Sequence, residues 1–351
     1  MKTIFKTLFL FITIGISAQQ SATDSEVVTK ALQEKEALTK TSIIKNLSFT
    51  NIGPTVMSGR VADIDVNPND PTEFYVGYAS GGLWYTNNNG ASFTPLLDNS
   101  PTQNVGDIAV DWNNRTIWVG TGEKNSSRSS YAGIGMLKSN NQGKTWEHVG
   151  LSDSHHVSRI VINSENPEEV VVGVIGHLYT PNKERGVFKT IDGGKTWKKT
   201  LFINNDTGII DVVAAPENPN VLYAASWERE RKAWNFDGDG NNSAIYKSTD
   251  GGDTWENISS NNGFRNGAGV GRIGLSVYDE NTVYALHDSQ FRRASKEKKK
   301  QGSSVLTKED FKKMSKDEFL KLTDKKLNNY LKANRFQEKY SAVSVKKMVR
   351  S

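Results

Sequence analysis

Five charged residues stand at one repeated position of the chain, directly before a β-branched residue of a short apolar segment. They are Asp63, Asp107, Arg159, Asp211 and Arg272. Carboxylate and guanidinium groups that converge can bind a charged or polar ligand, and two carboxylates that flank a glycosidic bond can hydrolyse it. The same charges can instead pair with one another and hold neighbouring parts of the fold in register. Both interpretations are open at the level of the sequence.

Further candidate residues lie beside these five. Glu123 and Glu228 join Asp63, Asp107 and Asp211 as weak candidates for a catalytic carboxylate. Arg60, Trp227 and Trp234 join the five charges as candidates for ligand contact. The two tryptophans flank a charged run, so they could stack on sugar rings or peptide side chains, or could pack between strands. No carboxylate pair is singled out, and we therefore expect binding rather than catalysis.

No metal or cofactor is expected. The chain has no Cys, which excludes thiolate ligands and disulfides. His155 and His156 are adjacent, and in a strand their side chains would point to opposite faces. The run DGDGNN at 237–242 has alternating oxygen ligands but lacks the glycine and the bidentate glutamate of an EF-type loop.

An octapeptide recurs among the elements that must position these residues. TIDGGKTW at 190–197 is nearly repeated at 248–255, with weaker copies at 86–93 and 139–146. Its glycines suit a tight hairpin, its Asp or Asn can accept bonds from the turn, and its aromatic residue can pack beneath it. We therefore predict a structural role for Asn88, Gly90, Phe93, Asn141, Gly143, Trp146, Asp192, Gly194, Trp197, Asp250, Gly252 and Trp255.

Each octapeptide closes a unit of four short strands. In the third copy the pattern predicts strands at 158–163, 169–175, 186–190 and 196–202. Four strands in roughly 50 residues is the size of a propeller blade. The sequence thus predicts an all-β propeller of four full blades and part of a fifth, with the ring incomplete. The five charges would surround one channel mouth, together with long loops at 123–133, 177–185 and 228–242.

The octapeptide resembles the Asp-box, or bacterial neuraminidase repeat. Residues 52–99 are also similar to the opening blade of large secreted bacterial proteins with sortilin-like or "glycosyl hydrolase" propellers, through Gly-Arg-Val at 59–61 and Ser-Gly-Gly-Leu-Trp at 80–84. The resemblance covers about 45–351 and implies the fold. It leaves sialidase- or xyloglucanase-like hydrolysis, peptide binding and a purely structural module open. Members of this family are longer, so we expect an N-terminal fragment.

Charge and hydropathy divide the chain into four segments. Residues 1–18 have the charged start and short apolar run of a signal peptide. Residues 19–46 read as a helical linker and 47–291 as the propeller. Residues 292–351 form a basic helical insertion or tail, with 19 Lys and Arg against 7 Asp and Glu. The rest of the chain is mildly acidic, which disfavours a nucleic-acid partner.

The sequence therefore predicts an exported bacterial protein, periplasmic, surface-bound or secreted. Its expected partner is an extracellular protein, peptide or glycan. No integral membrane segment is expected after the signal peptide is cleaved, because the apolar run is too short to span a bilayer.

Overall fold

The computed structural model describes residues 22–47, 59–260, 263–291 and 306–350. The chain divides into two compact units, Met1–Phe291 and Arg292–Ser351, which are described separately. The predicted signal peptide lies outside the described residues.

Four antiparallel sheets of four strands make up most of the first unit. In each sheet the strands follow one another in chain order, as in a meander. The first sheet holds β1 (Val61–Val66), β2 (Phe74–Tyr78), β3 (Gly82–Thr86) and β4 (Thr94–Pro95). The second holds β5 (Val105–Asp111), β6 (Thr116–Thr121), β7 (Met136–Ser139) and β8 (Glu147–His148). The third holds β9 (Val157–Ile162), β10 (Val170–Val174), β11 (Gly186–Thr190) and β12 (Lys198–Leu201).

The fourth sheet carries an additional hairpin. Its strands are β13 (Thr207–Ala215), β14 (Asn218–Glu228), β17 (Ile245–Ser248) and β18 (Glu256–Asn257). Between β14 and β17 lie the two short strands of the hairpin, β15 (Glu230–Arg231) and β16 (Phe236–Asp237). A fifth sheet consists of β19 (Val270–Asp279) and β20 (Thr282–Ser289).

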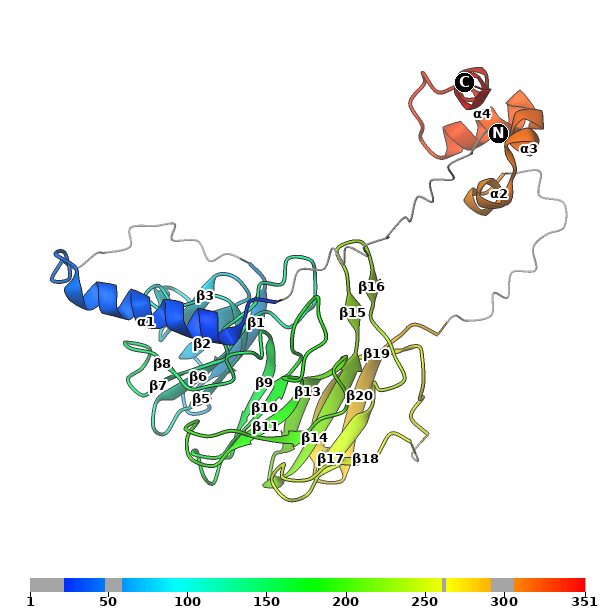
Figure 1. Ribbon diagram of the computed structural model, residues 1–351. Helices are drawn as coiled ribbons and strands as arrows, with labels where there is room; N and C mark the ends of the chain where they lie inside the picture. Colours follow the sequence, from blue (N-terminus) through cyan, green and yellow to red (C-terminus); the bar gives the residue numbers. More distant parts are fainter. Residues whose placement is uncertain (1–21, 48–58, 261–262, 292–305, 351) are drawn as a thin grey trace, which may run out of the picture. The chain divides into compact units, whose positions relative to one another are not determined.

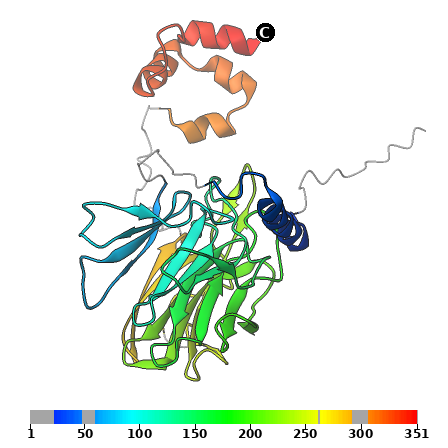
Figure 2. The same cartoon turned by 90° about the vertical axis from the view of Figure 1, so that its left-hand side faces the viewer.

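The sheets are arranged as propeller blades. The first strand of each sheet contacts the first strand of the next, so that β1, β5, β9, β13 and β19 lie side by side. Figures 1 and 2 show the sheets standing next to one another in this order. Strands that are innermost and adjacent in this way define the axis of a propeller. The predicted fold class, four full blades and part of a fifth, is thus confirmed.

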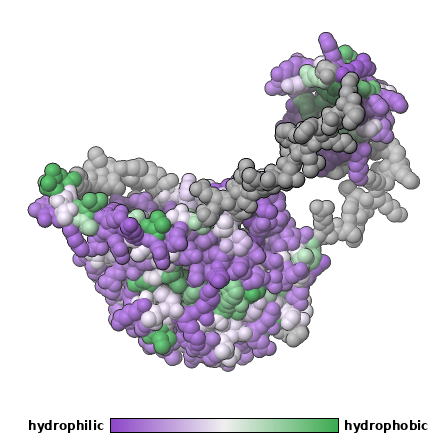
Figure 3. All heavy atoms as spheres, in the orientation of Figure 1, coloured by the Kyte–Doolittle hydropathy of each residue, from purple (hydrophilic) through white to green (hydrophobic). Residues whose placement is uncertain are grey.

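The apolar core lies between successive blades. Tyr75 and Leu83 of the first blade pack with Ile108 of the second, and Val171 of the third packs with Val212 of the fourth. Each blade therefore buries its apolar faces against its neighbours and not within itself. On the face of this unit that Figure 3 draws, hydrophilic residues predominate and apolar residues form small patches.

The two end blades keep apolar side chains exposed. Ile64 and Val66 of β1 and Tyr284 and Leu286 of β20 are exposed, whereas Ile160 at the position of Ile64 in the third blade is buried. Among the described residues no further sheet covers these faces, and the described strands do not close a ring.

The repeated octapeptides form the turns between the third and fourth strands. In the third blade Thr190 Oγ1 donates to Asp192 Oδ1 at 2.8 Å, and the Thr196 amide donates to the same oxygen at 2.9 Å. Gly194 has a positive φ of 92° and its amide donates to Thr190 Oγ1 at 2.9 Å. Because the side chain of Asp192 is used inside the turn, it is a fold element.

The tryptophan that follows the turn contacts the preceding blade. Trp197 Nε1 donates to the carbonyl of Val149 at 2.6 Å, and Trp146 Nε1 donates to that of Leu96 at 2.8 Å. Phe93, in the first blade, packs against Phe74 of its own blade instead. The turns therefore link blades as well as strands.

The two turns that contain an aspartate make the free energy of unfolding depend on pH in the acidic range. Hydrogen bonds from Thr196 lower the pKa of Asp192 to about 2. For Asp250 partial burial raises the pKa, but hydrogen bonds led by Thr254 outweigh it and lower the pKa to about 2. An unfolded aspartate has a pKa of about 3.9, so this contribution is fully present above about pH 4 and is lost as the pH falls toward 2.

We expect the double variant Asp192→Asn and Asp250→Asn to lose less stability than the natural chain between about pH 4 and pH 2. Asparagine fits the turn, because Asn141 Oδ1 already accepts from the Thr145 amide at 2.9 Å. Urea unfolding across this pH range measures the difference. Parallel pH profiles for the two proteins would contradict the assignment.

The remaining described elements are helices. In the first unit α1 (Ser25–Thr41) begins at the N-cap Asp24 and buries no side chain. The second unit holds α2 (Lys308–Lys313), α3 (Lys316–Lys321), α4 (Asp324–Ala333) and α5 (Ala342–Arg350), around the buried side chains of Leu327, Leu331 and Ala342. Thr307, Ser315 and Thr323 cap the first three of these helices. None of the described helices is both long and apolar enough to cross a bilayer.

Candidate ligand-binding face

Three aspartates form hydrogen bonds between the innermost strands of neighbouring blades. Asp63 Oδ2 accepts from the Ile108 amide of the next blade at 3.4 Å, and Asp107 Oδ2 accepts from the Ile160 amide at 2.8 Å. In the same way Asp211 Oδ2 accepts from the Leu275 amide at 3.0 Å. One oxygen of each carboxylate is therefore committed to the neighbouring blade.

Two cations pair with these three carboxylates. The guanidinium of Arg159 lies 3.0 Å from Asp211, 3.4 Å from Asp107 and 3.7 Å from Asp63. Lys124 Nζ donates to Asp107 Oδ1 at 2.6 Å and to the carbonyl of Ser158 at 2.9 Å. Four of the five repeated charges thus converge at one mouth and pair with one another, together with a lysine that the sequence pattern did not single out.

Burial sets the acidity of this cluster. Burial raises the pKa of Asp107 to about 6, although the charges of Lys124 and Arg159 lower it. Burial also raises the pKa of Asp63. The three surrounding carboxylates raise the pKa of Arg159 against its own desolvation, so this guanidinium stays charged.

Arg60 and Arg272 make different contacts. Arg60 Nη2 lies 2.9 Å from Glu123 Oε2, and its side chain is 46% exposed. Arg272 Nη1 donates to Asn125 Oδ1 at 2.6 Å, and burial lowers its pKa. Both arginines therefore reach the loop at 123–133, which brings the first and fifth blades to the second blade at this mouth.

Glu123 and Glu228 accept hydrogen bonds from residues of their own loops. Glu123 is buried and accepts from the Asn125 amide at 3.1 Å and from the hydroxyl of Ser130. Glu228 Oε2 accepts from the amide and from the side chain of Asn242, at 2.8 and 3.0 Å. These contacts close the loops 123–133 and 228–242 on themselves.

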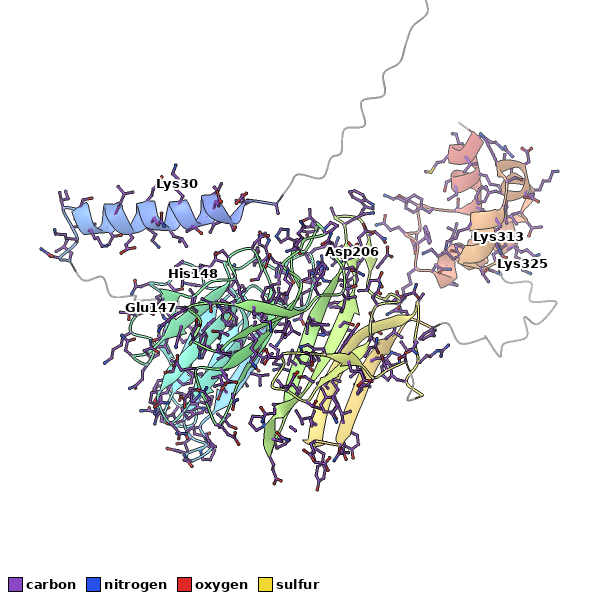
Figure 4. The ribbon with its side chains drawn as sticks, turned by 60° about the horizontal axis from the view of Figure 1, so that its bottom comes forward. Lys30, Glu147, His148, Asp206, Lys313 and Lys325 are labelled. Atoms are coloured by element: carbon purple, nitrogen blue, oxygen red, sulfur yellow. The ribbon has the colours of Figure 1, made fainter. Side chains whose placement is uncertain are left out.

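Each of the three long loops presents an exposed aromatic side chain. They are Tyr131, Tyr179 and Trp234, with Phe236 beside the last. The loops contact one another, since Tyr179 Oη donates to the carbonyl of Arg128 at 3.4 Å and Arg229 Nη1 donates to that of Leu178 at 3.1 Å. We call this surface, formed by 123–133, 177–185 and 228–242, the loop face. Figure 4 labels Asp206, whose carbonyl accepts from Arg185 of the loop 177–185 at 2.8 Å.

Of the two alternatives for Trp227, surface contact and packing between strands, the structure places its side chain in the core. Its side chain is only 4% exposed, and its Nε1 donates to the carbonyl of Gly238 at 2.8 Å. The reason is that β14 continues to Glu228, so Trp227 still belongs to a strand that faces the core. Trp234 lies beyond the strand and is 82% exposed.

A histidine cluster lies beside the loop 177–185. The rings of His155 and His177 are stacked with centroids 3.9 Å apart, and His177 Nε2 lies 3.1 Å from Asp153 Oδ1. His155 precedes β9 and has a positive φ of 54°, so the assumption that it occupies a strand is wrong. Burial, with the nearby His177, lowers the pKa of His155 to about 4. His156 points elsewhere, with Nδ1 3.0 Å from the carbonyl of Glu123.

The sequence holds one further signal for the mouth. A small residue precedes the charge in four of the five blades, as Ala62, Gly106, Ser158 and Gly271. A Cβ atom on Gly106 would lie 2.1 Å from the carbonyl oxygen of Val157 in the next blade. The innermost strands therefore approach too closely here for a larger side chain.

The solved structures to which this chain shows similarity include glycoside hydrolases. An ancestral GH74 enzyme is 20% identical over 65% of this chain and 29% of its own, with a TM-score of 0.48. The GH74 xyloglucanase from Xanthomonas campestris is 16% identical over 65% of this chain and 35% of its own, with a TM-score of 0.44. YCF48 bound to D1 peptide is 10% identical over 67% of this chain and 90% of its own, with a TM-score of 0.31.

The chain spans about a third of the length of those two GH74 proteins. Likenesses at this level carry no argument about activity or ligand. No curated protein matches the sequence. The family Sortilin-Vps10, described as "Sortilin, neurotensin receptor 3", matches residues 135–351, which is more than half of the chain. The chain therefore belongs to the Sortilin-Vps10 family.

Proposed function

We propose that this chain is a binding module that takes an extracellular protein, peptide or glycan on the loop face without chemically changing it. The observation that carries the proposal is the set of exposed aromatic side chains, one from each of three adjacent loops. Tyr131, Tyr179 and Trp234 offer rigid apolar area with a polar edge. Such side chains dominate the affinity of many interfaces and also stack on sugar rings.

Exposed cations complete this surface. Arg60 is half exposed at the mouth, and Arg128 is exposed on the loop that carries Tyr131. Guanidinium groups bind carboxylates and the carbonyls of an extended chain, and they also pack on aromatic rings. Aromatic and cationic groups on one face favour a ligand with acidic and apolar groups, such as a peptide segment.

Glycoside hydrolysis is the alternative, and the contacts at the mouth disfavour it. It requires two carboxylates that reach the substrate on either side of the scissile bond. Asp107 is fully buried, while Glu123 and Glu228 are held by their own loops. The family description also names a receptor and not an enzyme. A third possibility, a purely structural module, predicts no saturable ligand.

Export is part of the same proposal. The segment 1–18 has the pattern of a bacterial signal peptide. Mass determination of the N-terminus after expression in a bacterial host tests it, and cleavage after Ala18 is the expected result. Retention of the full N-terminus in the cell would contradict export.

Binding is tested with a peptide display library and a glycan array, alongside a screen with artificial glycosides. A saturable ligand without turnover supports the proposal. Turnover that is abolished by Asp63→Asn or Asp211→Asn would replace it with the hydrolase. If neither the peptide library nor the glycan array yields a saturable ligand, the structural module is favoured.

For a selected ligand, Trp234→Ala is expected to weaken binding by about 2 kcal/mol, which is roughly 30-fold, because exposed tryptophans at interfaces are common hot spots. Titration calorimetry measures the change. The matched control is Tyr278→Ala, another exposed aromatic residue, which lies next to the turn between β19 and β20. An equal loss in both variants would mean that the loop face is not the site.

A further inference from the structure

Three ligand-type side chains meet where the segment between β8 and β9 contacts the loop 177–185. The donor atoms of Asp153, His155 and His177 all lie within 4.8 Å of one another. Asp153 Oδ1 is 3.1 Å from His177 Nε2 and 3.8 Å from His155 Nε2. In a tetrahedral zinc site with bonds of 2.0–2.1 Å, neighbouring ligand atoms are about 3.3 Å apart. The observed spacings bracket this value.

The backbone of His177 is held in place by several contacts. Its amide donates to Asn182 Oδ1 at 3.1 Å. Its carbonyl accepts from Arg185 Nη2 at 3.0 Å and from Arg229 Nη2 at 3.2 Å. Asn182 Nδ2 also donates to the carbonyl of Asp153 at 3.3 Å, which ties the two segments together. A ligand set held this firmly loses little entropy when it binds a metal.

The second ring nitrogen of His177 has a partner that suits coordination. His177 Nδ1 lies 2.9 Å from Thr180 Oγ1. When Nδ1 donates to this hydroxyl, Nε2 is left with a free lone pair, and this second contact is typical of metal-bound histidines. His155 has a left-handed backbone, and its ring is stacked on that of His177 with an interplanar angle of 27°, so one ring must rotate before both Nε2 lone pairs can face one ion. A left-handed backbone is costly for a residue other than glycine and occurs preferentially at functional sites.

We propose that Asp153, His155 and His177 bind one Zn²⁺ ion. Two imidazole nitrogens and one carboxylate oxygen form a donor set that zinc favours over calcium or magnesium. Three protein ligands leave a fourth position for water or for a group of a bound ligand. The side chains of Asp153 and His155 are 36% and 17% exposed, so an ion can reach them. The metal would fix the loop 177–185 to the segment before β9.

Two guanidinium groups oppose this cation. Arg185 and Arg229 both contact the carbonyl of His177 and are buried. Asp153 is the one carboxylate of the cluster, so its negative charge must offset the positive charges of the two arginines. We therefore expect Asp153→Asn to weaken zinc binding as strongly as the loss of an imidazole.

The test is titration of the full metal-free chain with Zn²⁺, followed by calorimetry, and with Co²⁺, followed by the visible absorption of a four-coordinate ion. One equivalent should bind. We expect binding to be weakened by at least about 100-fold in each of three variants, His155→Gln, His177→Gln and Asp153→Asn. A factor of about 100 is the upper end of the loss expected when only a partner outside the coordination sphere is removed. Thr180→Val, which keeps all three ligands, should weaken it by about 10–100-fold.

The matched control is His148→Gln. This exposed histidine of β8 is labelled in Figure 4 and is not part of the cluster. The affinity of the His148→Gln variant for Zn²⁺ should equal that of the natural chain. Circular dichroism checks the folding of every variant, and His155→Gln serves if His177→Gln does not fold. A natural chain that takes up no Zn²⁺, or folded cluster variants that bind it as well as His148→Gln does, would overturn the proposal.

Discussion

Replacing Asp107 with alanine is expected to lower the free energy of unfolding by about 3–5 kcal/mol, because removal of one partner strands a buried charge. Lys124 is itself buried and lies 2.6 Å from Asp107. Arg159 is 3.4 Å away, and the Ile160 amide loses its acceptor. The carboxylate connects the second blade to the third, so the loss falls on the contact between blades.

Urea unfolding at about pH 8 measures this effect, since the pKa of Asp107 is about 6 and the carboxylate is then ionised. The matched control is Asp111→Ala, at the other end of the same strand. Asp111 accepts hydrogen bonds from its own turn, from the amides of Asn113 and Asn114 and from the Asn114 side chain, so its loss should cost about 1–2 kcal/mol. If Asp107→Ala keeps its stability but abolishes a hydrolytic activity, the carboxylate is catalytic and the proposed function is wrong.

The blades could be predicted because their signals are local. The turn at 190–197 uses contacts between residues at most four apart, such as Thr196 with Asp192. Strand lengths and turn residues repeat with the same short spacing. The predicted strands 158–163 and 186–190 therefore agree closely with β9 and β11.

The pairing of the charges at the mouth could not be chosen from the sequence. Asp107 and Arg159 are 52 residues apart, and their contact depends on how far each blade rotates from the last. Their shared position in the repeat was enough to place them at one mouth. It left open whether they bind each other or a ligand, and it gave no sign of Lys124, which enters from a loop.

The histidine cluster was missed for a related reason. His155 and His177 are 22 positions apart in the sequence and come from two different connections. In the sequence His155 is adjacent to His156, and that spacing alone suggests two side chains on opposite faces of a strand. His155 has a left-handed backbone conformation, and its ring is stacked on that of His177. The conformation of one residue outside the repeat leaves no periodic pattern in the sequence from which it could be predicted.

Trp118→Ala is expected to cost about 3–5 kcal/mol of unfolding free energy, the range for truncating a large buried aromatic side chain. Trp118 of β6 is 1% exposed. Trp197, which follows the turn of the next blade, meets its ring edge-on at 6.3 Å, and Lys138 Nζ lies 4.7 Å above the ring. Truncation would leave a cavity between two blades that each bury their apolar faces only against a neighbour.

A double-mutant cycle with Trp197→Ala separates the contact between the blades from the loss of volume. We expect a coupling of about 0.5–1.5 kcal/mol, as for other aromatic pairs. Trp234→Ala, at an exposed position, should stay within about 0.5 kcal/mol of the natural chain. Zero coupling would mean that the ring contact between Trp118 and Trp197 adds nothing to the loss of each side chain's volume. The hydrogen bond from Trp197 Nε1 to the carbonyl of Val149 would then be the contact through which this tryptophan links the two blades.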